Sequence, residues 1–199
     1  MNAVALVQQV LVFAIPVVFA ITVHEVAHGW VAGKLGDPTA KVMGRLTLNP
    51  VKHADPIGTV ALPLLLIFLS VPPFGWAKPV PVDWRNLRQP RRDMAIVAAA
   101  GPAANLAMLL FWLLFLMLVK GTTSSSYFAY VLVQMATTGM AINLILIVLN
   151  LLPLPPLDGS RIVMAFLSPK WAAQYAKLEP WGIPILLLLF VSISFMARQ

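Results

Sequence analysis

Long apolar stretches are the feature that most constrains the fold of this chain. Four of them cover approximately residues 4–33, 93–119, 128–151 and 181–197, close to or above the ~20 residues that a helix needs to cross a bilayer. Of the 199 residues, 60% are hydrophobic and 11% charged, whereas soluble domains have about 25% charged residues. One core of this size cannot bury so much apolar surface. The sequence excludes a soluble globular domain and a disordered chain, and it predicts an all-α polytopic membrane protein.

A fifth apolar segment, residues 57–71, is short for a span, and the positive-inside rule favours one placement for it. If the segment enters the membrane and returns, nine basic residues between positions 34 and 92 share one side with three between positions 161 and 177. Only two of the 14 basic residues then lie on the other side. We therefore expect about four transmembrane helices plus a re-entrant segment, with both termini outside. The excess of lysine and arginine behind the net charge of +7 is then expected on the inner face of the lipid bilayer. No nucleic-acid partner is expected.

The chain shows no internal repeat and no separate soluble domain, so residues 1–199 are expected to form a single transmembrane domain. No basic residue precedes Lys34. A cleavable signal peptide would have basic residues before its apolar region and a small-residue cleavage site after it. We expect the first apolar stretch to be a retained span of a multi-pass protein in the cell membrane.

His24, Glu25 and His28 form a His-Glu-x-x-His pattern inside the first apolar stretch. Histidines four residues apart lie on one face of a helix, where both can bind one Zn²⁺ with the glutamate near a water on the metal. The chain has no cysteine, which excludes thiolate ligands. The alternative is a pair of packing histidines, but ionisable residues inside a span are costly and usually functional. The motif predicts a zinc site.

A catalytic zinc has three protein ligands and an open position, so a third ligand must come from elsewhere. Asp158 is the leading candidate, because it follows the proline-rich break Asn150–Pro156, where the third long helix must end. The alternative is that Asp158 only caps a short helix from Gly159 to about Leu167. The competing carboxylates lie in charged loops; they are Asp37, Asp55, Asp83 and Asp93.

These motifs together resemble the site-2 protease family of intramembrane zinc metalloproteases. The resemblance rests on HEVAH at residues 24–28, on NLLPLPPLDG at residues 150–159, and on GPAAN at residues 101–105. The segments PVKHADPIGT and FGWAKPVPVD resemble a short, core-only bacterial and archaeal subgroup without the PDZ or CBS domain of other subgroups. The match extends over nearly the whole chain.

The resemblance implies that His24, His28 and Asp158 bind zinc and that Glu25 is the catalytic base. It also implies that Asn150 positions substrate or stabilises the reacting oxygen, and an amide donor near a metal could stabilise an oxyanion. A backbone cap at the helix break is the alternative role for Asn150.

The segment Phe74–Val82 is similar to the re-entrant β-hairpin of the family. Its residues alternate and are too rich in proline for a helix, which suits an edge strand. An edge strand can hold an extended substrate, so we expect this segment to align substrate. The alternative is an interfacial loop anchored by Trp76.

The expected function is intramembrane zinc endopeptidase activity on peptide bonds in or near transmembrane segments, as in regulated intramembrane proteolysis. By the resemblance, the substrate is a single-span membrane protein or peptide, and the active site faces the cytoplasmic side of a prokaryotic plasma membrane. The alternatives are a zinc-dependent multi-pass transporter, which needs no general base, and a scaffold with a closed four-ligand zinc site. A prenyl-peptide protease shares the motif but uses a glutamate as third ligand, and Glu179 lies in a charged loop. The sequence carries no signal for the oligomeric state.

Two further features bear on the surroundings of the site. His53 lies in a loop, where it either approaches the site or makes a loop hydrogen bond. The small residues of Ala98–Ala104 allow close helix packing in lipid, so this face is expected to back the zinc helix. Asn105 would then make a hydrogen bond between helices.

Overall fold

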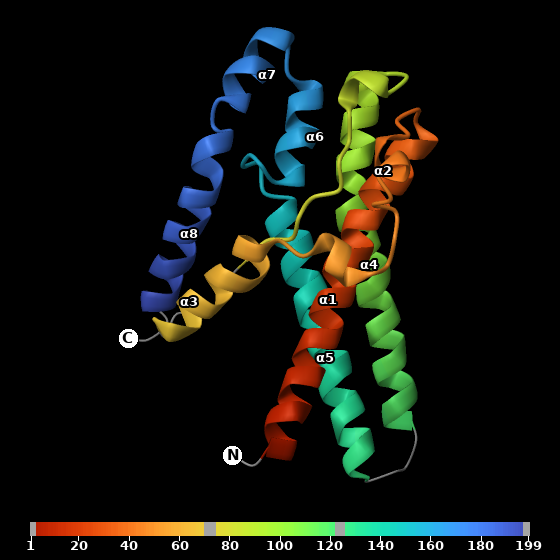
Figure 1. The fold of residues 1–199 in the computed structure, drawn as a ribbon, viewed down its shortest axis with the longest axis vertical. Coiled ribbons are helices and arrows are strands. Elements are labelled where there is room, and N and C mark those ends of the chain that lie inside the picture. Colours follow the sequence, from red (N-terminus) through yellow and green to blue (C-terminus); the bar gives the residue numbers. More distant parts are fainter. Residues whose placement is uncertain (1–2, 70–74, 122–125, 197–199) are drawn as a thin grey trace.

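The computed structural model of the chain describes residues 3–69, 75–121 and 126–196 (Figure 1). Every regular element in these residues is a helix. The all-α prediction is therefore confirmed for the part of the chain that the structure describes.

Three long apolar helices form the centre of the molecule: α1 (Ala3–Lys34), α4 (Pro90–Gly121) and α5 (Tyr127–Asn150). All three are long and apolar enough to cross a membrane. Helix α4 packs against α1 and α5, and α1 also packs against α5. The approach of α5 to α4 depends on Gly139, because a Cβ there would lie 2.4 Å from the ring of Trp112. Three predicted spans are thus helices with the expected length and composition.

The other two apolar stretches form shorter helices. Helix α8 (Glu179–Met196) occupies the fourth predicted span, and its apolar part Glu179–Leu189 is shorter than the three long helices. The π-helical turn η2 (Pro56–Ala61) and helix α3 (Leu62–Phe68) occupy the predicted re-entrant segment. In Figure 1 the chain comes down from the end that holds α2, passes through α3, and returns to that end at the start of α4. Whether residues 57–71 cross the membrane or return stays a prediction.

The predicted β-hairpin is not present in the described residues. Residues 75–83 form neither strand nor helix before the 3₁₀ turn η3 (Trp84–Asn86). Phe74, at the start of the predicted hairpin, lies outside the described residues. Prolines at positions 79 and 81 give a physical reason, because each lacks the N–H that a continuous β-ladder requires.

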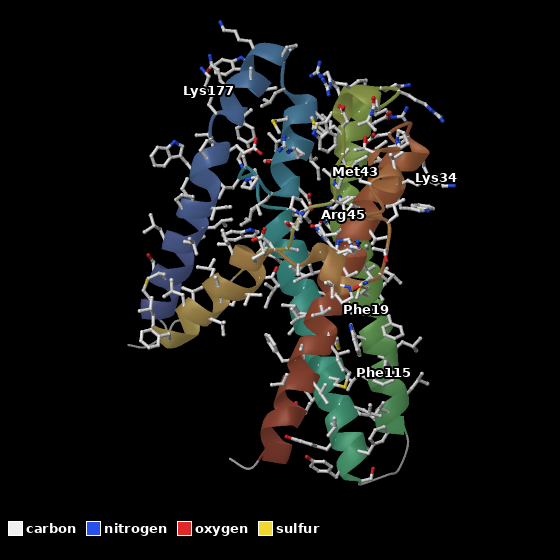
Figure 2. All side chains as sticks on the ribbon, in the orientation of Figure 1. Phe19, Lys34, Met43, Arg45, Phe115 and Lys177 are labelled. Carbon is white, nitrogen blue, oxygen red and sulfur yellow. The ribbon has the colours of Figure 1, made fainter. Side chains whose placement is uncertain are left out.

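Polar elements gather at one end of the molecule. This end holds the short helices α2 (Thr39–Val42), α6 (Asp158–Phe166) and α7 (Pro169–Ala176). Figure 2 shows Lys34 and Lys177 at this end, whereas Phe19 and Phe115 lie in the opposite half. The distribution of charge along the sequence thus becomes an asymmetry along the long axis of the molecule.

Asp37 connects the end of α1 to the loop before α4. Its fully buried carboxylate accepts hydrogen bonds from the backbone and hydroxyl of Thr39, from the backbone N–H of Asp83 at 2.8 Å, and from the side chain of Asn86 at 3.0 Å. Burial alone would raise the pKa of Asp37, but these hydrogen bonds to the charged form outweigh burial and lower the pKa. Asp37 is therefore a structural residue that holds the loop against α1.

Replacing Asp37 with alanine should lower the free energy of unfolding by ~1–3 kcal/mol, because buried donors lose their acceptor. The folded-state pKa of Asp37 lies below the unfolded value of about 3.9. The contribution of the carboxylate is therefore complete above that pH and is lost as the pH falls through the folded-state pKa. Thermal unfolding in detergent should show a lower Tm for Asp37→Ala at pH 7 and a smaller gap below pH ~4. An equal Tm at pH 7 would contradict this role.

Candidate metal centre

Three side chains from helices α1 and α6 lie close together at the His-Glu-x-x-His motif. His24 and His28 lie one turn apart on α1, and their Nε2 atoms are 3.1 Å apart. Asp158 lies in the first turn of α6, and its Oδ2 is 3.3 Å from the Nε2 atom of each histidine. The three residues expected to bind zinc are therefore brought together by the fold, and they form the one such cluster of His, Asp and Glu side chains in the described residues.

The spacing of these three atoms suits zinc. In a tetrahedral site with bonds of ~2.0–2.1 Å, neighbouring ligand atoms lie about 3.3–3.4 Å apart. The separations of 3.1 and 3.3 Å nearly match this value. The Oδ2 atom of Asp158 is also buried and has no hydrogen-bond partner among the described residues. A buried carboxylate oxygen without a donor is costly, and a cation between the three atoms would remove that cost.

Hydrogen bonds on the far side of each imidazole orient the ligand nitrogens. Nδ1 of His28 donates to the carbonyl of Val97 at 2.8 Å, since a carbonyl can only accept. Nδ1 of His24 lies 2.6 Å from Oδ1 of Asn105. With the protons on Nδ1, both Nε2 atoms keep a lone pair for a metal, and such outer partners also fix the orientation of the rings.

A buried pair of asparagines determines which way Asn105 points. Its Nδ2 donates to Oδ1 of Asn143 at 2.9 Å and approaches the carbonyl of Ala20 at 3.4 Å. Nδ2 of Asn143 in turn donates to the carbonyl of Gly139. Because the amide nitrogens are used in this way, Oδ1 of Asn105 must face His24 and accept its proton. The predicted hydrogen bond between helices is confirmed, and it extends through Asn143 to α5.

Gly101 makes room for the imidazoles on the neighbouring helix. A Cβ at this position would lie 2.4 Å from Nε2 of His28 and 2.5–2.7 Å from ring atoms of His24. The predicted small-residue face of α4 therefore does lie against the zinc helix. The backbone of α4 comes this close because no side chain intervenes.

The route to Asp158 follows the proline-rich break. Helix α5 ends at Asn150, and α6 begins at Asp158 with Leu157 as its N-cap residue. No side chain caps α6. The alternative in which Asp158 only caps the short helix is therefore wrong: its carboxylate lies against the two histidines instead.

Glu25 and the cluster line a common cavity of about 330 Å³. Besides the cluster, its walls come from the segment before α4, from α4 itself and from the end of α5; they include Pro79, Val80, Val82, Val97 and Asn150. The backbone N–H of Val80 donates to Oε2 of Glu25 at 2.7 Å. The carboxylate expected to act as base thus lines the same cavity as the three candidate ligand atoms.

Asn150 and His53 have local hydrogen bonds. Asn150 lines the cavity, and its Nδ2 donates to the carbonyl of Leu146 on the same helix at 3.0 Å. His53, in the turn η1 (Pro50–His53), bonds to the carbonyl of Thr47 at 2.8 Å. The loop hydrogen bond is therefore the alternative that holds for His53, which is not among the residues that line the cavity.

Comparison with known proteins relates the chain to zinc metalloproteases. It is 43% identical over 180 residues to a Bacillus subtilis protein named "Putative zinc metalloprotease YwhC", covering 89% of this chain and 79% of that protein. Proteins named Rip2, with the same description, are 32% identical in Mycolicibacterium smegmatis and 30% identical in Mycobacterium tuberculosis. The chain spans 64% of their length. No family model and no solved structure matches the chain.

Replacing Gly101 with alanine should weaken zinc binding by ~10–100-fold, the loss typical when the support of a ligand is disturbed. The added methyl group would lie 2.4 Å from a ligand nitrogen, so α1 and α4 must separate. Gly121→Ala on the same helix is the matched control, because nothing lies within 4 Å of its Cβ position. Zinc affinity measured by chelator competition checks this. Equal zinc affinity of Gly101→Ala and wild type would show that the close approach of α4 to the imidazoles at Gly101 is not required.

Proposed function

The chain belongs to the site-2 protease family of zinc metalloproteases, and we propose on this premise that it is an intramembrane zinc endopeptidase. The observation that carries the proposal is the convergence of His24, His28 and Asp158 in one cavity with Glu25. The reaction is hydrolysis of a peptide bond in or near a transmembrane segment of another membrane protein.

The residues of the cavity have separate roles in this reaction. His24, His28 and Asp158 would hold the metal, and a bound zinc would supply a Lewis acid and a site at which water is more acidic than in bulk. Glu25 takes the proton of the attacking water and delivers it to the leaving nitrogen. Of its two amide hydrogens, Asn150 uses one on Leu146, so the other remains for a reacting oxygen.

The segment beside the cavity is suited to hold an extended substrate. A helical substrate hides its peptide bonds in its own hydrogen bonds, so it must unwind before cleavage. The carbonyl of Val80 and the N–H of Val82 have no hydrogen-bond partner among the described residues, and both residues line the cavity. A substrate strand can pair with these groups, as peptides do with exposed backbone edges. The function proposed for Phe74–Val82 thus rests on its last three residues.

The distribution of charge supports a multi-pass protein of the cell membrane whose active site faces the cytoplasm. His24 and His28 lie in the last third of α1, which ends at Lys34, and Asp158 begins α6. Figure 2 labels Lys34 and Lys177 at the end of the molecule that holds α2, α6 and α7. Cytoplasmic ends carry the excess of lysine and arginine. Water then reaches the cavity from the cytoplasmic side.

A Glu25→Gln variant tests the function most directly. It should reduce cleavage of a transmembrane peptide by at least ~100-fold, because general-base catalysis contributes about 10²–10⁴-fold. Zinc content should stay that of wild type, since Glu25 is not part of the ligand cluster. The measurements are peptide cleavage in detergent and metal analysis of the purified protein.

The comparison with Asp158→Ala separates the proposed function from its alternatives. This variant should lose zinc and activity together. A transporter with a zinc-dependent gate would keep its activity in Glu25→Gln, and a scaffold would show no cleavage in wild type. A wild-type protein that cleaves at full rate after treatment with a chelator would also overturn the proposal.

Val82→Pro tests the role of the segment in substrate alignment. Proline removes the unpaired N–H of Val82 without breaking a hydrogen bond among the described residues. The KM for a transmembrane peptide should rise several-fold, about what a lost hydrogen bond of 0.5–1.5 kcal/mol gives, while zinc content stays normal. If zinc content and activity fall together, the segment is a structural support.

A further inference from the structure

We propose that the backbone N–H of Val80 is a positioning group for the catalytic base, so that the substrate-aligning segment and Glu25 are held as one unit. The inference rests on the proposed protease function and goes beyond it by assigning a role to a main-chain atom. Its starting point is the hydrogen bond of 2.7 Å from Val80 N to Oε2 of Glu25.

The local sequence makes Val80 the single donor in its neighbourhood. Pro79 and Pro81 flank it, and neither has an N–H. Between Lys78 and Val82 the backbone therefore offers one amide hydrogen, and that hydrogen is directed at Glu25. Val80 is itself buried, with 7% of its surface exposed, so water competes little for the bond.

The segment is held from its other side by two further contacts. The guanidinium of Arg45, itself buried, donates to the carbonyls of Lys78 and Pro79 at 3.0 and 3.3 Å. The N–H of Lys78 donates to the carbonyl of His53 at 2.8 Å. These bonds place the backbone just before Val80, so the position of its N–H is determined by the fold and not by Glu25 alone.

A glycine on α1 allows the segment to come within reach of Glu25. Gly29 lies four residues after Glu25, which is one turn along the same face. A Cβ at Gly29 would lie 2.7 Å from Cγ1 of Val80 and from Cδ2 of Leu46. Any side chain at this position would push the segment away from α1 and lengthen the bond between Val80 and Glu25.

The bond has a direct consequence for the base. It occupies Oε2 of Glu25 and limits rotation of the carboxylate, while Oε1 has no hydrogen-bond partner among the described residues. One oxygen is thus an anchor and the other is available to take a proton. A base held in this way needs no reorientation when substrate binds, and small errors in the placement of catalytic groups reduce rates strongly.

Val80→Pro tests the inference in the full-length protein. Proline extends the run of prolines and removes the N–H, and it also replaces the valine side chain. We expect kcat for a transmembrane peptide to fall by ~10–100-fold, with little change in KM and with normal zinc content. Val80→Ala keeps the amide and should recover most of the lost kcat. This pattern differs from that of Val82→Pro, in which KM rises.

Hydrogen exchange of the metal-free protein gives a second readout that does not depend on activity. Because positions 79 and 81 have no amide hydrogen, exchange in a peptide covering residues 77–82 reports few sites, Val80 among them. The Val80 amide should exchange at least ~10-fold faster in Glu25→Ala than in wild type. Glu25→Gln keeps an oxygen acceptor and should stay close to wild type.

A pair of glycine variants completes the test. Gly29→Ala should speed exchange at Val80 and lower kcat, whereas Gly33→Ala on the same helix, with nothing within 4 Å, should do neither. Equal exchange at Val80 in wild type and Glu25→Ala would overturn the inference, as would an unchanged kcat or a loss of zinc in Val80→Pro. Absence of cleavage by wild type would instead overturn the proposed function and leave the exchange result to stand alone.

Discussion

The candidate site depends on keeping three potential ligand atoms about 3 Å apart in a partly buried position. Two imidazole lone pairs and a carboxylate oxygen crowded together are unfavourable without a cation, because burial removes the water that would otherwise solvate them. Neighbouring residues on α4 help to keep these three atoms close together. Gly101 lets α4 approach the rings, and the acceptors on Val97 and Asn105 direct both Nε2 atoms to the same point.

Much of the fold follows from the apolar stretches, because a helix that crosses a bilayer needs a minimum length of uninterrupted apolar sequence. The prolines after Asn150 likewise predict the end of α5, since proline removes the hydrogen bonds of a helix. The hairpin was not predictable in the same way. Alternation suggests a strand, but the donors of residues 79 and 81 are missing, and the described residues around them are held by contacts that are distant in sequence.

Some residues of the site were predictable from the sequence and others were not. His24, Glu25 and His28 are predictable because their spacing is local, and Asp158 because it follows the proline-rich break after the third long apolar stretch. Asn143 was missed, although an asparagine inside an apolar span is itself a signal, since an unpaired amide in lipid is costly. The contact of Val80 with Glu25 involves a main-chain atom 55 positions away, and no side-chain pattern reports such a contact.

The position of Asp158 in the sequence determines when the candidate metal centre can form during synthesis of the chain. His24 and His28 leave the ribosome well before Asp158, which lies 130 positions after His28. Chains emerge and fold from the amino terminus, so a nascent chain holds two imidazoles without the carboxylate until α1, α4 and α5 have been synthesised. Zinc affinity comes largely from a completed ligand set. A translation product that stops before Asp158 therefore lacks one of the three candidate ligands, and the centre can form only after that residue has been made.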